Sequence, residues 1–378
     1  NKHNLSFLYW VTLMADNFDY IIVGAGSSGC VLANRLSANR KNSVCILEAG
    51  PPDWNPFIHI PAGFMKTLVN PNVNWLFKSE PSWGTDGRVI DIPRGKTLGG
   101  SSSINGMVFN RGQNLDFDVW AQKGNKGWSY SDLLPYFKKY EKRLGEFDDV
   151  YRGTQGELPI TDLEYRDPLC EAFIKSAIEQ GIPLNKDYNG KLQEGVSYVQ
   201  RTTRGRFRVS AAKAFLKPAK SIKNLQIITN AFVTKINFNN KTAIGVEYLI
   251  GGRGGKKINL KANKEIILSS GVIKSPHILH MSGVGPVEDL KKLGIDVIHD
   301  LKGVGMNLRD HFAPRLTARA KNVETVNEKS RGFKLLKEIG KYIIGKQSIV
   351  NLSPTLVYCF WHSNEEIRNH DLQMTFTP

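Results

Sequence analysis

Three glycines at a fixed spacing are the strongest candidate for binding chemistry in this sequence. Gly24, Gly26 and Gly29 follow an apolar run at 18–23 that predicts a buried strand, and they precede a predicted helix at 30–38. In that context Gly24 permits a tight turn, Gly26 lets the backbone approach a pyrophosphate, and Gly29 lets the helix pack closely on the strand. The N–H groups at the start of the helix would then face the phosphates.

An acidic residue strengthens this interpretation. A second predicted strand at 44–47 ends at Glu48, 19 residues after Gly29. A carboxylate at this place can accept hydrogen bonds from both hydroxyls of a ribose, which argues against a 2′-phosphate and therefore against NADP. The motif predicts a dinucleotide site and leaves FAD and NAD as alternatives.

A second glycine-rich run, at 99–106, has the sequence Gly-Gly-Ser-Ser-Ser-Ile-Asn-Gly. Its glycines and serines offer backbone and hydroxyl donors along which an extended phosphate–ribityl chain could lie. Asn105 and Gly106 could bring a side-chain amide and a bare N–H to the edge of an isoalloxazine ring. Hydrogen bonds there would stabilise the negative charge that develops when a flavin accepts a hydride. Taken alone, such a run is typical of a surface turn.

Several motifs in order along the chain resemble the glucose–methanol–choline (GMC) oxidoreductase family. Residues 95–112 resemble its first signature, and 271–285 resemble its second, with Val272 where a small residue is usual. Residues 230–234 resemble the family strand whose valine contacts adenine, and 303–311 resemble its GVGxNLxDH segment. The resemblance is closest to bacterial choline-dehydrogenase-like members.

The resemblance implies FAD as the cofactor. Ile104 stands where some members carry a flavin-linking histidine, so we expect FAD to be bound without a covalent link. The expected cofactor-binding residues are Gly24, Gly26, Ser27, Ser28, Gly29, Glu48, Ala49, Thr97, Gly99, Gly100, Ser101, Asn105, Gly106, Met107, Val108 and Val233.

The expected fold is α/β: an FAD-binding, Rossmann-like parallel sheet domain joined to a second, α+β substrate domain that is incomplete. We assign 17–130 and 205–311 to a discontinuous FAD-binding domain, and 131–204 and 312–378 to the substrate side. Residues 1–16 are expected to be an extension outside the native structure, with the natural start at Met14. The chain is expected to be truncated at its C-terminus.

The family resemblance implies oxidation of the CH–OH group of a primary alcohol, choline-like or other, by hydride transfer to flavin N5. The electron acceptor, oxygen or a quinone-type carrier, stays open. A histidine suits the proton transfer because its pKa lies near neutral pH, but in the family it is expected beyond Pro378. We therefore assign no catalytic residue and expect this chain alone to be inactive. The alternative is a non-catalytic flavin-binding fragment or interaction module.

Other histidines offer no better site. His277 and His280 are spaced to share one face of a predicted helix and could bind a metal, but no third ligand is placed to help, so no metal is predicted. His311 belongs to a segment that the resemblance marks as structural.

Charge and cysteine content limit the remaining classes. The formal net charge of +16 is spread along the chain, and no recognition motif supports nucleic-acid binding. The densest basic cluster, the four arginines between 201 and 208, is interpreted as a loop at a domain junction, which leaves a peripheral contact with membranes open. The cysteines form no Cys-x-x-Cys pair, which favours a reducing compartment. They are Cys30, Cys45, Cys170 and Cys359. We expect a cytoplasmic protein, with membrane association as the alternative.

Overall fold

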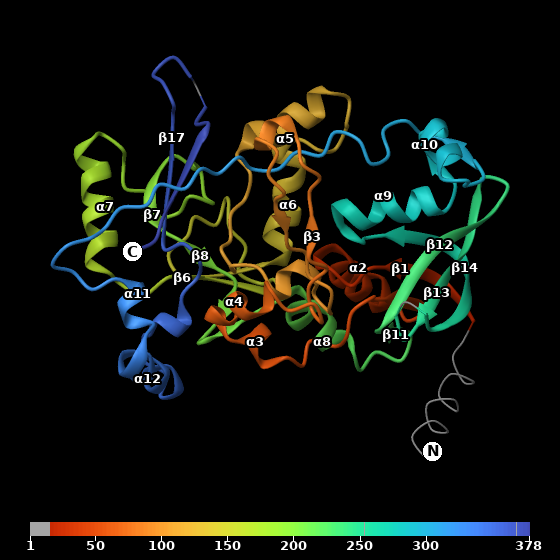
Figure 1. Ribbon diagram of the computed structural model, residues 1–378, viewed down its shortest axis with the longest axis horizontal. Coiled ribbons are helices and arrows are strands. Elements are labelled where there is room, and N and C mark those ends of the chain that lie inside the picture. The colour runs from red at the N-terminus through yellow and green to blue at the C-terminus, as the bar shows by residue number, and fades with distance from the viewer. Residues whose placement is uncertain (1–15, 253, 368) are drawn as a thin grey trace. The chain divides into compact units, whose positions relative to one another are not determined.

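The computed structural model describes residues 16–252, 254–367 and 369–378 (Figure 1). The chain forms two compact units, each of which is built from several stretches of sequence. The first unit takes the residues up to 53 together with 70–102 and 211–314. The second takes 54–69, 103–210 and 315–378.

A six-stranded sheet forms the centre of the first unit. Its order is β11 (Leu225–Ile228), β2 (Val44–Leu47), β1 (Asn17–Val23), β14 (Lys256–Leu268), β13 (Thr242–Ile250) and β12 (Ala231–Asn239). The first four strands run parallel, while β13 and β12 are added by antiparallel pairing. The predicted Rossmann-like parallel sheet is therefore confirmed, with an antiparallel extension at one edge. Both faces of β2 are buried, as expected for a strand inside a covered parallel sheet.

Helices and short elements complete the first unit. They are α2 (Ser27–Ala38), the π-helical turn η4 (Ala212–Leu216) with α8 (Lys217–Ala219), α9 (Gly271–Met281), α10 (Val287–Lys292), β3 (Phe77–Lys78), β4 (Asp91–Ile92), β15 (Val284–Gly285), β16 (His299–Asp300), η2 (Trp83–Thr85) and η3 (Gly100–Ser103). Helix α2 buries Cys30, Ala33 and Ser37, which are spaced so that they share one face. Small side chains on that face allow α2 to approach the sheet closely.

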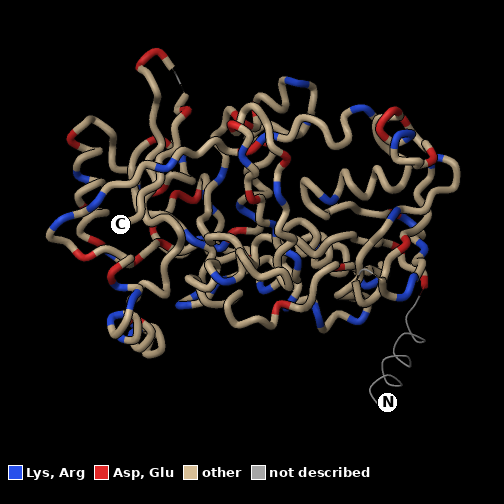
Figure 2. The backbone as a smooth tube through the Cα atoms, viewed as in Figure 1, with Lys and Arg blue, Asp and Glu red and all other residues tan. Residues whose placement is uncertain are grey.

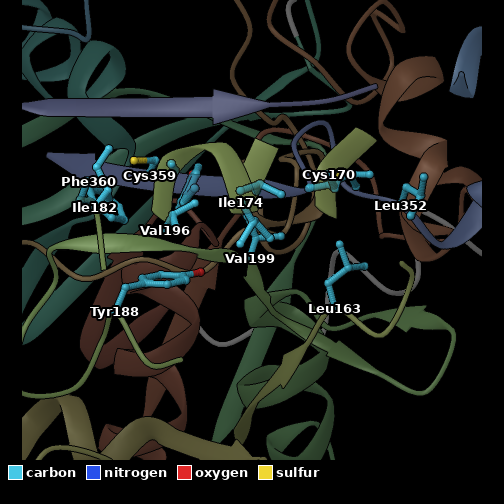
Figure 3. Close-up of a cluster of buried hydrophobic side chains, with 14 of the residues drawn as sticks. Leu163, Cys170, Ile174, Ile182, Tyr188, Val196, Val199, Leu352, Cys359 and Phe360 are labelled. Carbon is cyan, nitrogen blue, oxygen red and sulfur yellow. The ribbon is translucent and has the colours of Figure 1, made fainter. Parts of the chain in front are cut away.

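The second unit contains two three-stranded sheets. One has the order β18 (Leu372–Phe376), β17 (Val357–Trp361), β7 (Gly195–Tyr198), and the other β5 (Glu141–Leu144), β6 (Leu158–Asp162), β8 (Gln200–Arg201). The remaining elements are α3 (Pro56–His59), η1 (Pro61–Gly63), α4 (Phe64–Thr67), α5 (Asn114–Gln122), α6 (Tyr130–Tyr140), α7 (Pro168–Glu179), β9 (Thr203–Arg204), β10 (Phe207–Arg208), α11 (Val326–Lys329), α12 (Gly332–Ile343) and η5 (Ile349–Asn351). Buried side chains of α7, β7 and β17 form its main core (Figure 3).

The boundary between the units differs from the one expected. The stretch 103–130 belongs to the second unit, because its backbone is bonded there. The N–H of Phe109 donates to the carbonyl of Gln200, and the N–H of Arg111 donates to the side-chain oxygen of Asn189 at 2.7 Å. The hydroxyl of Tyr188 also donates to the carbonyl of Phe109. These hydrogen bonds join distant stretches of sequence, and no local sequence pattern predicts them.

The arginine cluster is also different from the expected loop. Three of its members lie on β8, β9 and β10, and Arg206 lies in the turn between β9 and β10. The side chains of Arg201 and Arg208 are buried. Arg208 donates to the carbonyl of Ile58 and to Asn105 Oδ1, both at 2.7 Å. Burial lowers the pKa of both guanidinium groups to about 10. Arg201 and Arg208 thus bind acceptors of their own unit, which leaves only Arg204 and the partly buried Arg206 nearer the surface.

All four cysteines are buried and free, and burial raises the pKa of the Cys170 thiol to about 12. Within the described ranges, no helix has both the length and the apolar character needed to cross a bilayer.

Candidate functional site

A cavity of about 480 Å³ opens in the first unit where the parallel strands end. Val23, Leu47 and Leu268, the last residues of β1, β2 and β14, line it. Strand β1 pairs with β2 on one side and with β14 on the other. Open α/β sheets bind their ligands in a crevice outside the carboxyl ends of the parallel strands, which is the edge that this cavity occupies. The topology thus places a binding site where the glycine motif was found.

The three glycines of the motif have different environments. Gly24 has a φ of +101°, and a Cβ built on it would lie 2.7 Å from the carbonyl oxygen of Ser269. A Cβ on Gly29 would lie 2.0 Å from the carbonyl oxygen of Gly24. On Gly26, by contrast, the nearest atom to a Cβ is 3.8 Å away. Gly24 and Gly29 are therefore required for the turn itself, whereas the bare backbone of Gly26 faces the cavity.

The first turn of α2 has the donors that an anion site needs. Its residues Ser27 and Ser28 line the cavity, and the turn contains no acidic side chain. Gly26 caps the helix without a side-chain hydrogen bond, so N–H groups of the first turn are left for a ligand. Those N–H groups and the helix dipole favour phosphate.

The second glycine-rich run packs directly against this turn. The N–H of Gly99 donates to the carbonyl of Ala25 at 2.8 Å. A Cβ on Gly100 would lie 2.7 Å from the Cα of Gly26, so only glycine fits there. Gly100 and Ser101 line the cavity. Thr97 lies behind them and donates its hydroxyl to the carbonyl of Pro51. Two motifs that are distant in sequence therefore form one wall.

Glu48 lies at the end of β2 and lines the cavity beside Ala49. Its carboxylate is buried and accepts the N–H groups of Ala25 and Gly50, each at 2.9 Å. Burial raises the pKa of this carboxyl from 4.5 to about 7, against the opposing effect of the two N–H donors. Glu48 therefore fixes the glycine turn in addition to any contact with a ligand.

Stability should depend on pH through Glu48. Between pH 4.5 and about 7 the unfolded chain ionises this carboxyl while the folded chain still holds its proton, so the free energy of unfolding falls as pH rises through this window. We expect the wild type to lose about 3 kcal/mol relative to Glu48→Gln between pH 4.5 and pH 8. Urea unfolding of both proteins at several pH values measures this. Parallel pH profiles would contradict it.

An aromatic and basic wall of the cavity was missed by the sequence reasoning. Lys274 Nζ lies 4.9 Å from the ring centre of Trp75 and 5.7 Å from that of Phe232. These three residues line the cavity together with Val233, which was expected from the family strand. They come from three distant stretches, and although Phe232 and Lys274 lie in segments that resemble the family, no local pattern predicts that they meet Trp75.

The expected flavin-edge residues Asn105, Gly106, Met107 and Val108 belong to the second unit. Asn105 Oδ1 accepts from the N–H of Met107 at 3.0 Å and from Arg208, so its oxygen is engaged within this unit. Met107 has a φ of +62°, a left-handed conformation that a side chain rarely adopts. A constrained turn of this kind occurs often at binding sites, and the assignment of these four residues to a flavin stays a prediction.

The three histidines that the sequence singled out, His277, His280 and His311, lie in different surroundings. His277 lines the cavity on α9, and His280 Nε2 lies 3.1 Å from the carbonyl oxygen of Val304. His311 is exposed. Across the part of the chain that the structure describes, no three His, Cys, Asp or Glu side chains are grouped so that they could hold a metal.

Comparison with known families and proteins agrees with this geometry. The model of the GMC oxidoreductase family matches residues 18–313. An alcohol dehydrogenase [acceptor] from Pseudomonas putida is 44% identical over 295 residues, which cover 78% of this chain and 53% of the relative. An oxygen-dependent choline dehydrogenase from Sinorhizobium fredii is 48% identical over 295 residues, which cover 78% of this chain and 53% of the relative. The chain thus spans about half the length of the curated relatives it matches.

Solved structures show the same fold. A formate oxidase from Aspergillus oryzae superposes with a TM-score of 0.85 at 26% identity, covering 96% of this chain and 68% of the other. A pyridoxine 4-oxidase from Mesorbium loti gives a TM-score of 0.71 at 33% identity, covering 76% and 56%.

Proposed function

Because this chain belongs to the GMC oxidoreductase family, we propose that it binds FAD without a covalent link and that the whole protein oxidises the CH–OH group of a primary alcohol. One observation carries the proposal: the Gly24–Gly29 turn and the Gly99–Ser101 run form one wall of a cavity at the carboxyl ends of β1 and β14. Relatives named for alcohol and for choline support an alcohol as the substrate class.

The donor set of the cavity fits a dinucleotide. The first turn of α2 offers N–H groups to a pyrophosphate, and Gly26 leaves space for it. Glu48 offers carboxylate oxygens to a ribose, and Val233 lines the same cavity for the adenine. The FAD group, when bound, supplies an acceptor for the hydride that leaves the alcohol carbon.

The residues of this chain would bind and orient the reactants. Ser101 offers a hydroxyl along the cavity wall, and Asn105 and Gly106 are assigned to the flavin edge, where donors stabilise developing negative charge. None of the described residues is assigned as the proton acceptor. We assign cofactor binding to this chain and alcohol oxidation to the protein as a whole, with an electron acceptor still to be identified.

Titration of the chain with FAD tests the binding step. We expect the flavin fluorescence to change saturably, and we expect FMN, which lacks the adenosine monophosphate half of FAD, to bind at least about tenfold more weakly. Equal binding of FMN and FAD, or no binding of either, would remove the assignment of this cavity to FAD.

Anaerobic bleaching of the flavin absorbance tests the reaction, using the longest natural form of the protein with choline, an aliphatic primary alcohol and an aromatic primary alcohol. Bleaching by one class establishes hydride transfer and identifies the substrate class. If FAD binds and no alcohol bleaches it, a non-catalytic flavin-binding role replaces the dehydrogenase.

A further inference from the structure

Helix α12 (Gly332–Ile343) presents an apolar face to solvent. Phe333 is 90% exposed, and Leu336, Ile343 and Ile344 are each more than 60% exposed. At 100° per residue these side chains fall on one side of the helix and form a continuous stripe. An exposed apolar stripe of this kind, with polar residues beside it, is typical of a surface that binds a partner or a membrane.

The opposite face of α12 is already occupied by its own unit. The hydroxyl of Tyr342 donates to the carbonyl of Arg206 at 3.1 Å, and Arg206 donates back to the carbonyl of Tyr342 at 2.9 Å. Glu338 is buried and accepts the N–H of Ile349 at 3.0 Å. The helix is therefore held in place, and its apolar stripe cannot turn inward without breaking these bonds.

Basic residues recur along α12, and Figure 2 colours the backbone at Lys and Arg positions blue. At 100° per residue, Lys334, Lys337 and Lys341 fall along one edge of the apolar stripe. The segment 326–346 has six Lys and Arg residues against two Glu residues, and one of these, Glu338, is buried in an ion pair with Lys341. Lys334 pairs with Glu324 at 2.6 Å. Arg331 and Lys337 are exposed and form no ion pair with another described residue. The edge of the stripe therefore carries a net positive charge.

We propose that the exposed face of α12 binds the surface of an anionic lipid bilayer, with Phe333, Leu336 and Ile343 among the acyl chains and the lysines at the headgroups. An amphipathic helix with one apolar face and a basic polar face lies in the plane of such an interface. Each basic side chain near the surface adds to the attraction. A second copy of the chain would present the same positive charges and so be repelled along this edge.

Flotation of the longest natural form of the protein with vesicles tests the proposal, because this chain spans about half the length of the relatives it matches. We expect binding to equimolar phosphatidylcholine and phosphatidylglycerol to be at least about tenfold stronger than to phosphatidylcholine alone, and to weaken as salt is raised. Binding that is equal on both vesicles, or absent from both, would overturn the proposal.

Two variants separate the apolar and basic contributions. The triple change Phe333→Ser, Leu336→Ser and Ile343→Ser should reduce binding at least about tenfold. Arg331→Gln with Lys337→Gln breaks no ion pair and should remove most of the preference for anionic vesicles. Leu192→Ser with Phe147→Ser, at exposed positions elsewhere in the same unit, should leave binding unchanged.

The oligomeric state separates a bilayer from a second copy. Sedimentation of the wild type without lipid should show no self-association that the triple variant abolishes. A dimer that dissociates in the triple variant would assign the stripe to contact between copies and overturn the bilayer proposal. Because the two glutamine substitutions lie on the exposed surface, they test the proposal even if the serine variant fails to fold.

Discussion

Gly26→Ala should weaken FAD binding at least about 100-fold while leaving the fold unchanged. A methyl group at this position meets no protein atom closer than 3.8 Å, and Gly26 has a φ of −75° that alanine adopts without strain. The methyl group would instead stand in the cavity, at the point where the turn must approach a phosphate. Fluorescence titration gives the affinity, and urea unfolding gives the stability.

Gly29→Ala is the matched control. It adds the same methyl group three residues away, where we expect it to lower the stability of the fold and not to enter the cavity. Its Cβ would lie 2.0 Å from the carbonyl oxygen of Gly24, and both partners are backbone that cannot move aside cheaply. We expect the free energy of unfolding to fall by about 3 kcal/mol or more. If Gly26→Ala keeps wild-type affinity for FAD, the glycine turn is not the phosphate site.

The local part of the site could be predicted from sequence because each signal lies within a few residues. The strand, the turn and the helix at 17–38 are specified by an apolar run, three glycines and a stripe of small residues, and the structure confirms them. The sequence also predicts that Glu48 belongs to this site, because the second strand ends at Leu47, directly before it. Its bonds to Ala25 and Gly50 were not foreseen, since a carboxylate at a strand end carries no mark of its backbone partners.

The other part depends on contacts between distant stretches. Lys274, Trp75 and Phe232 meet in one wall although no periodic pattern links them. The arginine cluster gave a basic pattern, but the pattern does not show that Arg208 turns inward to the carbonyl of Ile58. Such long-range contacts are set by the tertiary fold, and local patterns in a single sequence do not predict them.

A third long-range contact ties the stretch 103–130 to the second unit. Arg111 lies in the stretch that resembles the first GMC signature, yet it is buried against Glu141 in the second unit. Its side chain also donates to the carbonyl of Tyr151 at 2.7 Å. A buried guanidinium needs such acceptors, so the position of Arg111 fixes the position of the backbone around it.

Glu141→Gln should therefore lower the free energy of unfolding by about 3–5 kcal/mol. Glu141 is fully buried and accepts from both Arg111 and Arg152, with Arg152 Nε at 2.9 Å. Arg152 also reaches Asp187 and the side-chain oxygen of Gln200. The substitution keeps the shape of the side chain but leaves two buried guanidinium groups with one carboxylate between them. Urea unfolding measures the loss, and near-UV circular dichroism should show altered packing around Tyr188.

Two comparisons decide whether the charge or the hydrogen bonds of Glu141 carry this effect. Lys175→Ala removes an exposed ion pair with Glu179 and should change stability by no more than about 0.5 kcal/mol. Replacing Glu141, Arg111 and Arg152 together by Leu, Met and Met should cost less than Glu141→Gln alone, because no buried guanidinium group is then left without its carboxylate. Asp187, which loses Arg152 in this variant, is partly exposed and still accepts from Gln200. If the triple variant is as unstable as the single one, the network contributes through its geometry, and Arg111 is held in place chiefly by its bonds to Asn189 and Tyr151.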